Sequence, residues 1–162
     1  MPIAIETFSP DQTAGIAALI VPIQREEFGI PITYDDQPDL KDIQGFYRRG
    51  AGEFWVARDG STVIGSIALL DIGEAGGALR KMFVHRDWRG AAHGVAQCLL
   101  DALLAHARRK GLAAIHLGTT DKFLAAHRFY EKNGFVAVPA EALPPTFPRM
   151  AVDTRFYRLG LG

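Results

Sequence analysis

The stretch that decides the fold is Phe83-Val84-His85-Arg86-Asp87-Trp88-Arg89-Gly90-Ala91-Ala92-His93-Gly94-Val95-Ala96. The apolar run from Leu79 to Val84 that leads into it predicts a strand. After it, apolar residues recur at helical spacing and predict a helix from about 93 to 110, an estimate good to a few residues. Gly111 is suited to end that helix. The stretch is therefore a loop between a strand and a helix.

This loop is suited to binding an anion. Small residues at positions 90–92, 94 and 96 let a ligand approach the backbone closely. The first amides of a helix have no partner within the helix, and together with the helix dipole they suit a pyrophosphate. Arg86 and Arg89 could add charge-assisted hydrogen bonds. The alternative is that the glycines only turn the chain. A dinucleotide-binding unit is disfavoured because Gly90 and Gly94 lack the G-x-G-x-x-G spacing.

The flanking sequence predicts a mixed sheet covered by helices. Strands are expected at about 3–8, 53–58, 62–70, 79–84, 113–117, 135–138 and 152–159, and further helices after Ser9, from Pro38 to about Gly50, and from Thr120 or Asp121 to Asn133. Pro22 should kink or end the first helix, Asp59-Gly60 predicts a hairpin, and residues 71–77, with three glycines, predict a loop. The strand-helix-strand segment 79–117 predicts a right-handed crossover with parallel strands; the other strands are expected to be antiparallel.

Composition limits the classes of partner. The chain has 162 residues and 48% hydrophobic residues, so a single domain spanning residues 1–162 is expected. Its 18 acidic and 18 basic residues balance, which argues against nucleic acid or an anionic membrane as a partner. One cysteine, Cys98, excludes an internal disulfide. No signal peptide or membrane-spanning apolar run is recognisable, so we expect a cytoplasmic protein.

A second segment, Ala126-x-x-Phe129-Tyr130-Glu131-Lys132-Asn133-Gly134-Phe135, follows the loop. Together with Val84-x-x-x-x-Arg89-Gly90, Gly94-Val95-Ala96 and Ile64-Gly65, it resembles the GNAT superfamily of acyl-CoA-dependent N-acyltransferases over most of residues 52–138. The sequence departs from that pattern in three places. Two additional residues separate Arg89-Gly90 from Gly94, Phe123 stands where the family often has asparagine, and residues 78–81 lack the glutamate that some members carry.

The resemblance implies an α+β (α/β) fold. Its sheet would be mixed and mostly antiparallel, with about seven strands, about four flanking helices, and a splayed central pair of parallel strands at 79–84 and 113–118. The implied cosubstrate is acetyl-CoA (coenzyme A), whose pantetheine would bond to strand backbone and whose pyrophosphate would lie on the loop. The predicted coenzyme-binding residues are Met82, Phe83, Val84, Arg89, Gly90, Ala91, Ala92, His93, Gly94, Val95, Ala96, Phe123 and Ala126.

The reaction implied by the resemblance is direct attack of a primary amine on the thioester. No enzyme nucleophile is then needed, and we interpret Cys98 as a small buried hydrophobe. Tyr130 is the predicted catalytic acid, because a phenol with a pKa near ~10 stays protonated at neutral pH. The alternative for Tyr130 is core packing. The base is left open among water and four side chains: Glu26, Glu27, Glu74 and His116.

The acceptor pocket is expected to form from residues 24–37 and 139–151. Its expected lining is Tyr34, Asp35, Asp36, Phe147 and Met150. The two acidic residues would favour a cationic amine, of a small molecule or a peptide, although they could instead cap the second helix. No metal is predicted, because the histidines lack zinc-like pairing. A homodimer is left open. The rival functions are a non-catalytic acyl-CoA-binding sensor of the same fold and a dinucleotide-binding fragment.

Overall fold

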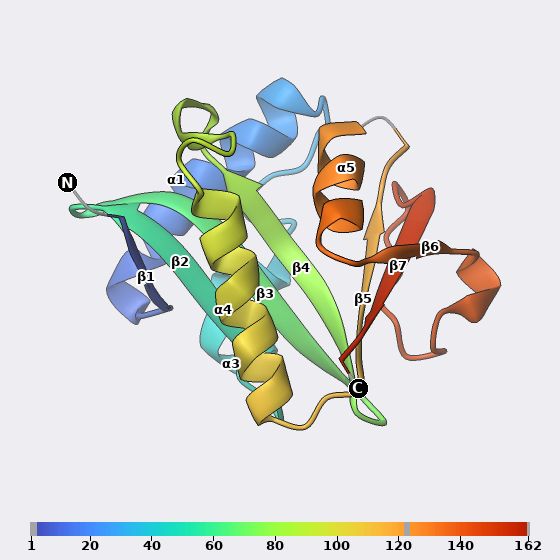
Figure 1. The fold of residues 1–162 in the computed structure, drawn as a ribbon. Coiled ribbons are helices and arrows are strands. Elements are labelled where there is room, and N and C mark those ends of the chain that lie inside the picture. The colour runs from blue at the N-terminus through green and yellow to red at the C-terminus, as the bar shows by residue number, and fades with distance from the viewer. Residues whose placement is uncertain (1–2, 122–123, 162) are drawn as a thin grey trace.

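The computed structural model describes residues 3–121 and 124–161, which form one seven-stranded mixed sheet covered by helices on both faces (Figure 1). The strand order is β1-β2-β3-β4-β5-β7-β6, and the β4–β5 pair is parallel while the other neighbours are antiparallel. The strands are β1 Ala4–Thr7, β2 Glu53–Asp59, β3 Thr62–Gly73, β4 Gly76–Val84, β5 Ala114–Thr119, β6 Val136–Val138 and β7 Arg155–Gly160. The predicted fold class is confirmed.

The helices divide between the two faces of the sheet. They are α1 Thr13–Pro22, α2 Pro38–Lys41, α3 Ile43–Tyr47, α4 Val95–Arg109 and α5 Leu124–Lys132. On one face α4 buries Leu99 and Leu103 in a cluster that also holds Tyr130 of α5. On the other face α1 buries Ile16 and Ile20 in a second cluster with α2 and α3. Figure 1 shows α4 in front of the sheet and α1 behind it.

The central parallel pair opens after a short contact. β4 and β5 are paired only from Gly76–Ala78 to residues 114–116. Beyond that point β5 stays paired with β7 on its far side while β4 stays paired with β3, so the two strands part (Figure 1). The β5-facing backbone groups of residues 79–84 consequently lack a strand partner among the described residues. This is the splay that the resemblance implied.

A bulge bends β4 at the opening. Ser66 of β3 lies opposite Phe83 and Ala68 lies opposite Arg80, so one β3 residue faces two residues of β4. Lys81, in the bulge, has a φ of 50°, and its carbonyl accepts a hydrogen bond from the Ser66 hydroxyl at 2.7 Å. Bulges re-aim side chains and recur beside functional sites. Here the bulge changes which side chains of β4 face the splay.

The segment 71–77 is not the loop that its glycines predicted. β3 continues to Gly73, which pairs with Gly76 across a two-residue turn. The turn residues Glu74 and Ala75 have φ values of 52° and 58°, the paired positive φ of a tight hairpin turn. Gly77 is needed for close packing inside β4, because a Cβ there would lie 2.6 Å from the Leu69 Cδ1 atom. These glycines therefore serve the strand and not a loop.

Two other local expectations need correction, whereas the expected end of the first helix at Pro22 is confirmed. The hairpin after β2 turns at Gly60 and Ser61, because Asp59 is already paired with Thr62. The helix expected from Pro38 is divided into α2 and α3 at Asp42, whose side chain accepts a hydrogen bond from the Gly45 amide. At Pro22, where a kink or break was expected, α1 gives way to a π-helical turn, Ile23–Glu27.

Candidate functional site

A cavity of about 700 Å³ opens where β4 and β5 part. Its walls come from β4 at residues 79–84, from β5 and the residues after it at 117–120, and from α5. The segment after α1, residues 23–32, and the loop before β7, residues 147–153, complete it on the opposite side of the sheet from α4. Such a cavity, lined by residues from both faces of β4, can hold an extended thioester together with an acceptor.

The loop 90–94 leads into α4, and the first amides of that helix are unengaged. Gly94 is the N-cap residue of α4, with a φ of 66°. Within the described chain, no hydrogen bond is made by the amides of Val95, Ala96 and Gln97, which are the first three of the helix. Three adjacent free amides at the positive end of a helix suit a phosphate group. The geometry therefore fits the predicted position of the pyrophosphate.

Arg89, predicted to bind the coenzyme, is engaged in holding this loop. Its guanidinium pairs with the Glu27 carboxylate at 2.7 Å, and its Nε donates to the Val84 carbonyl at 2.8 Å. The hydrogen bond from Arg89 lowers the pKa of Glu27. Arg89 also lines the cavity. The pair joins the π-helical turn to the loop, and it removes Glu27 as a free candidate for the base.

The other predicted coenzyme residues divide into two groups. Met82, Phe83, Val84 and Ala126 line the cavity. Residues 90–96 form the loop and the start of α4; they are small except for Val95, which is buried, and His93, whose exposed ring packs edge-on against Trp88. Phe123 lies outside the described residues. The assignments to coenzyme binding stay predictions.

Tyr130 lies on α5 at the wall of the cavity. Its side chain is buried, and its hydroxyl donates to the Met82 sulfur at 3.8 Å. Burial, with a smaller contribution from Tyr157, raises the pKa of Tyr130 to about 12. Its ring also packs against Phe135 and Tyr157, so the core-packing interpretation holds as well. A phenol that is buried, protonated and directed at the splay can donate a hydrogen bond to a sulfur atom there.

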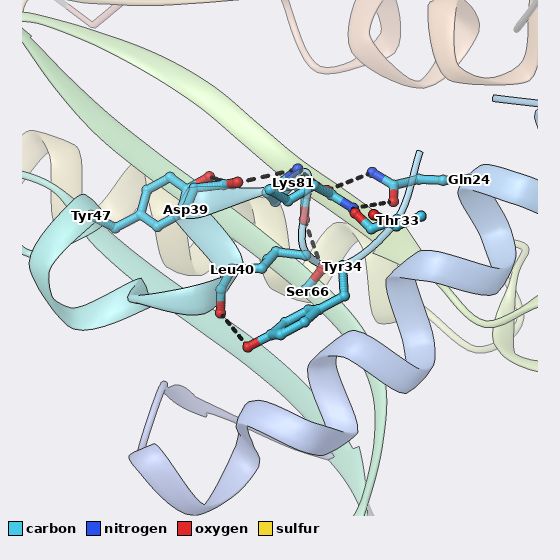
Figure 2. Close-up of polar contacts among 9 residues, drawn as sticks. Gln24, Thr33, Tyr34, Asp39, Leu40, Tyr47, Ser66 and Lys81 are labelled. Atoms are coloured by element: carbon cyan, nitrogen blue, oxygen red, sulfur yellow. Dashed lines mark hydrogen bonds and ion pairs between the residues drawn. The ribbon is translucent and has the colours of Figure 1, made fainter. Parts of the chain in front are cut away.

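Figure 2 shows a polar network that sequence reasoning missed. The Lys81 ammonium lies 3.4 Å from the Asp39 carboxylate and donates to the Gln37 side-chain oxygen at 2.6 Å. The Tyr47 hydroxyl donates to Asp39 at 2.6 Å, and the amides of Gln24 and Gln37 pair reciprocally. Burial lowers the pKa of Lys81, against the attraction of Asp39. The network ties the bulge to α2 and to the segment after α1, and so fixes one wall of the cavity.

None of the four side chains proposed as the base lines the cavity. Glu26 is exposed, Glu74 lies in the β3–β4 turn, and Glu27 is paired with Arg89. His116 is buried on β5, and its Nδ1 atom has no hydrogen-bond partner among the residues described. Burial, followed by the charge of Arg158, lowers the pKa of His116.

Asp153 is the carboxylate that does line the cavity. Its side chain lies over Gly118 of β5, where a Cβ would be 2.6 Å from Oδ2, and it accepts a hydrogen bond from the Met150 amide. Burial raises the pKa of Asp153, while that hydrogen bond and the charge of Arg80 act in the opposite direction. No sequence pattern pointed to Asp153, which was expected to lie within the last strand.

Two expectations about other side chains are wrong. Cys98 is exposed on α4 and is not a buried hydrophobe. In the acceptor pocket, Phe147 and Met150 line the cavity as expected, but the 34–36 segment does not. Asp35 is exposed and pairs with Lys41, and Asp36 accepts a hydrogen bond from the Thr33 amide. The acidic lining that suggested a cationic acceptor is therefore absent from this part of the described cavity.

Known proteins share this architecture. A structure of a GNAT-family acetyltransferase from Staphylococcus aureus Mu50 is 35% identical and superposes with a TM-score of 0.93, covering 99% of this chain and 100% of that one. N-acetylglutamate synthase from Neisseria gonorrhoeae, solved with coenzyme A and N-acetyl-glutamate, shares the fold with a TM-score of 0.76 at 18% identity, over 100% of this chain and 36% of that one. The fold is thus that of the GNAT acetyltransferases.

The sequence comparison gives the family itself. The acetyltransferase (GNAT) family model matches residues 18–135. An N-acetylaspartate synthetase from Xenopus tropicalis is 33% identical over 125 residues, which is 75% of this chain and 45% of that protein. The chain therefore spans less than half the length of that relative. This protein therefore belongs to the acetyltransferase (GNAT) family. No helix in the described chain is long and apolar enough to cross a membrane.

Proposed function

We propose that the protein transfers the acetyl group of acetyl-CoA to a primary amine, by direct attack within the splay. The observation that carries this proposal is the cavity between β4 and β5, with the protonated hydroxyl of Tyr130 at its wall. The β5-facing backbone of residues 79–84 has no strand partner in the part of the chain that the structure describes and is available to the pantetheine amides, except at the Val84 carbonyl, which already accepts a hydrogen bond from Arg89. The free amides at the start of α4 are available to the pyrophosphate.

The reaction needs two proton movements. The amine nitrogen forms a bond to the thioester carbon, and the carbon–sulfur bond breaks to release the thiolate of coenzyme A. Tyr130 is the proposed acid and donates a hydrogen bond to the departing sulfur as negative charge develops there. The attacking nitrogen must lose a proton, and Asp153 is the proposed acceptor because its carboxylate lines the same cavity. No covalent enzyme intermediate is required.

Relatives support transfer to nitrogen. Their names denote acetylated amino acids, N-acetylaspartate and N-acetyl-glutamate, or N-acetyltransferases in general. The experiment is a thiol-release assay with acetyl-CoA over a library of primary amines, with mass spectrometry of the acetylated product. Calorimetric titration of acetyl-CoA runs in parallel. Tight coenzyme binding with no thiol release for any amine would contradict the proposal and favour a non-catalytic sensor.

A further inference from the structure

The charged side chains that line the cavity differ in whether they have a partner of opposite charge. Its charged lining side chains are Arg80, Lys81, Arg89 and Asp153. Lys81 has the carboxylate of Asp39 as its partner, and Arg89 has that of Glu27. The side chain of Arg80 makes neither a hydrogen bond nor an ion pair with any residue in the ranges 3–121 and 124–161. A half-buried guanidinium without a carboxylate partner is costly, and it is suited to an anion that arrives with a ligand.

The strand register fixes the side of the sheet on which Arg80 lies. Arg80 is directly opposite Ala68 of β3, and Ala68 belongs to the core cluster under α1, α2 and α3. Residues directly opposite each other in an antiparallel pair point to the same face. The loop proposed for pyrophosphate leads into α4 on the other face. Arg80 is therefore placed to meet the acceptor and not the phosphates of the coenzyme.

Asp153, which also lines the cavity, carries the charge opposite to that of Arg80. It lies over Gly118 on β5, whereas Arg80 is on β4, and the two strands are no longer paired at this point. No ion pair joins the two side chains in the described structure, although the charge of Arg80 acts on Asp153. An unpaired cation and an unpaired anion on facing walls match a ligand that carries both charges.

The remaining lining of the acceptor side is apolar. It includes Ile23, Phe28, Ile30, Phe147 and Met150. We propose that the acceptor is a free amino acid with an apolar side chain, whose carboxylate is bound by Arg80 and whose ammonium is bound by Asp153. This inference rests on the proposed function, which requires only a primary amine. It also distinguishes free amino acids from peptide amines, because a peptide N-terminus has no carboxylate beside its amine.

The test compares amines that differ only in the carboxylate. L-leucine is set against 3-methylbutylamine, and L-phenylalanine against 2-phenylethylamine, with L-leucinamide standing in for a peptide N-terminus. The amino acids are expected to have kcat/KM values at least about 10-fold higher than those of their partners, as is typical for a charge-assisted hydrogen bond. Equal or faster turnover of the amines without a carboxylate would overturn this inference and leave the proposed function intact. No turnover of any amine would overturn both.

The variant Arg80→Gln tests whether Arg80 causes the preference for amines that carry a carboxylate. We expect it to raise the KM for L-leucine about 10-fold or more while the KM for acetyl-CoA and for 3-methylbutylamine stays unchanged. Arg149→Gln is the matched control, because Arg149 also acts on Asp153 but stacks over Phe156 and does not line the cavity. If Arg80→Gln does not fold, Arg80→Lys keeps the charge and should keep the preference for L-leucine. A rise in the KM for acetyl-CoA alone would assign Arg80 to the coenzyme and refute the proposal.

Discussion

Replacing Tyr130 with phenylalanine tests the chemistry most directly. The change removes one buried hydroxyl, whose only hydrogen bond described is to the Met82 sulfur at 3.8 Å. The ring and its contacts with Phe135 and Tyr157 remain, so the fold should be retained. We expect Tyr130→Phe to lower kcat by roughly 10²-fold, at the lower end of the usual range for acid–base catalysis, with little change in the affinity for acetyl-CoA.

The expected loss of kcat follows from the pKa of the Tyr130 phenol. Tyr130 has a pKa of about 12, whereas an ordinary thiol has a pKa of about 8.5. Complete proton transfer from this phenol to a free thiolate is therefore unfavourable by roughly 5 kcal/mol, at about 1.4 kcal/mol for each tenfold step. The benefit must come from a hydrogen bond that strengthens as the sulfur becomes charged. Hydrogen bonds to charged groups contribute about 1.5–3 kcal/mol, which corresponds to roughly 10- to 150-fold in rate.

The assay is steady-state thiol release, with a rapid-mixing measurement to establish that chemistry limits the rate. Tyr157→Phe is the control, because Tyr157 touches Tyr130 but donates its hydroxyl to Glu131 at 2.6 Å, outside the cavity. Since the pKa of Tyr130 is raised, its hydroxyl stays protonated through the assay range. The pH profile of kcat between about 6 and 10 should thus keep its shape in the phenylalanine variant. An unchanged kcat in Tyr130→Phe, with chemistry limiting, would remove the tyrosine from the mechanism.

The other predictions concern the coenzyme loop and the buried ion pair. Gly94→Val should weaken acetyl-CoA binding at least about 10-fold in a calorimetric titration, because a side chain at a φ of 66° strains the helix start by about 1–2 kcal/mol and displaces the free amides. Gly111→Val, at a φ of 76° beyond the other end of α4, is the control and should lose stability but keep its affinity. Lys81→Met should lower the free energy of unfolding by about 3–5 kcal/mol in a urea titration, because it leaves the Asp39 carboxylate buried without its cation. Adding Asp39→Asn should recover part of that loss, and a double variant no more stable than Lys81→Met would contradict the pairing.

Much of the architecture could be predicted because its signals are local. The helical spacing of Val95, Leu99 and Leu103 identified α4, and Gly111 marked its end. The order of strands and helices identified the parallel β4–β5 pair. The β3–β4 hairpin was missed because its turn residues, Glu74 and Ala75, adopt positive φ without being glycine. The pairing of two long strands imposes this conformation, and neither glutamate nor alanine is a residue type that predicts a positive φ.

The cations on the proposed acceptor side could not be predicted, because their positions depend on the bulge in β4. In a regular strand consecutive residues point to opposite faces, so Arg80 and Lys81 would be separated by the sheet. The bulge turns both toward the face that carries α2, where Lys81 meets Asp39 and Arg80 lies opposite Ala68, while Met82 packs in the cluster under α4. The same extra residue thus places two cations at the wall of the cavity proposed for the acceptor, and a thioether beside Tyr130. A prediction from simple alternation places one of those cations on the wrong face of the sheet, and it therefore misjudges the charge that the cavity offers to the proposed acceptor.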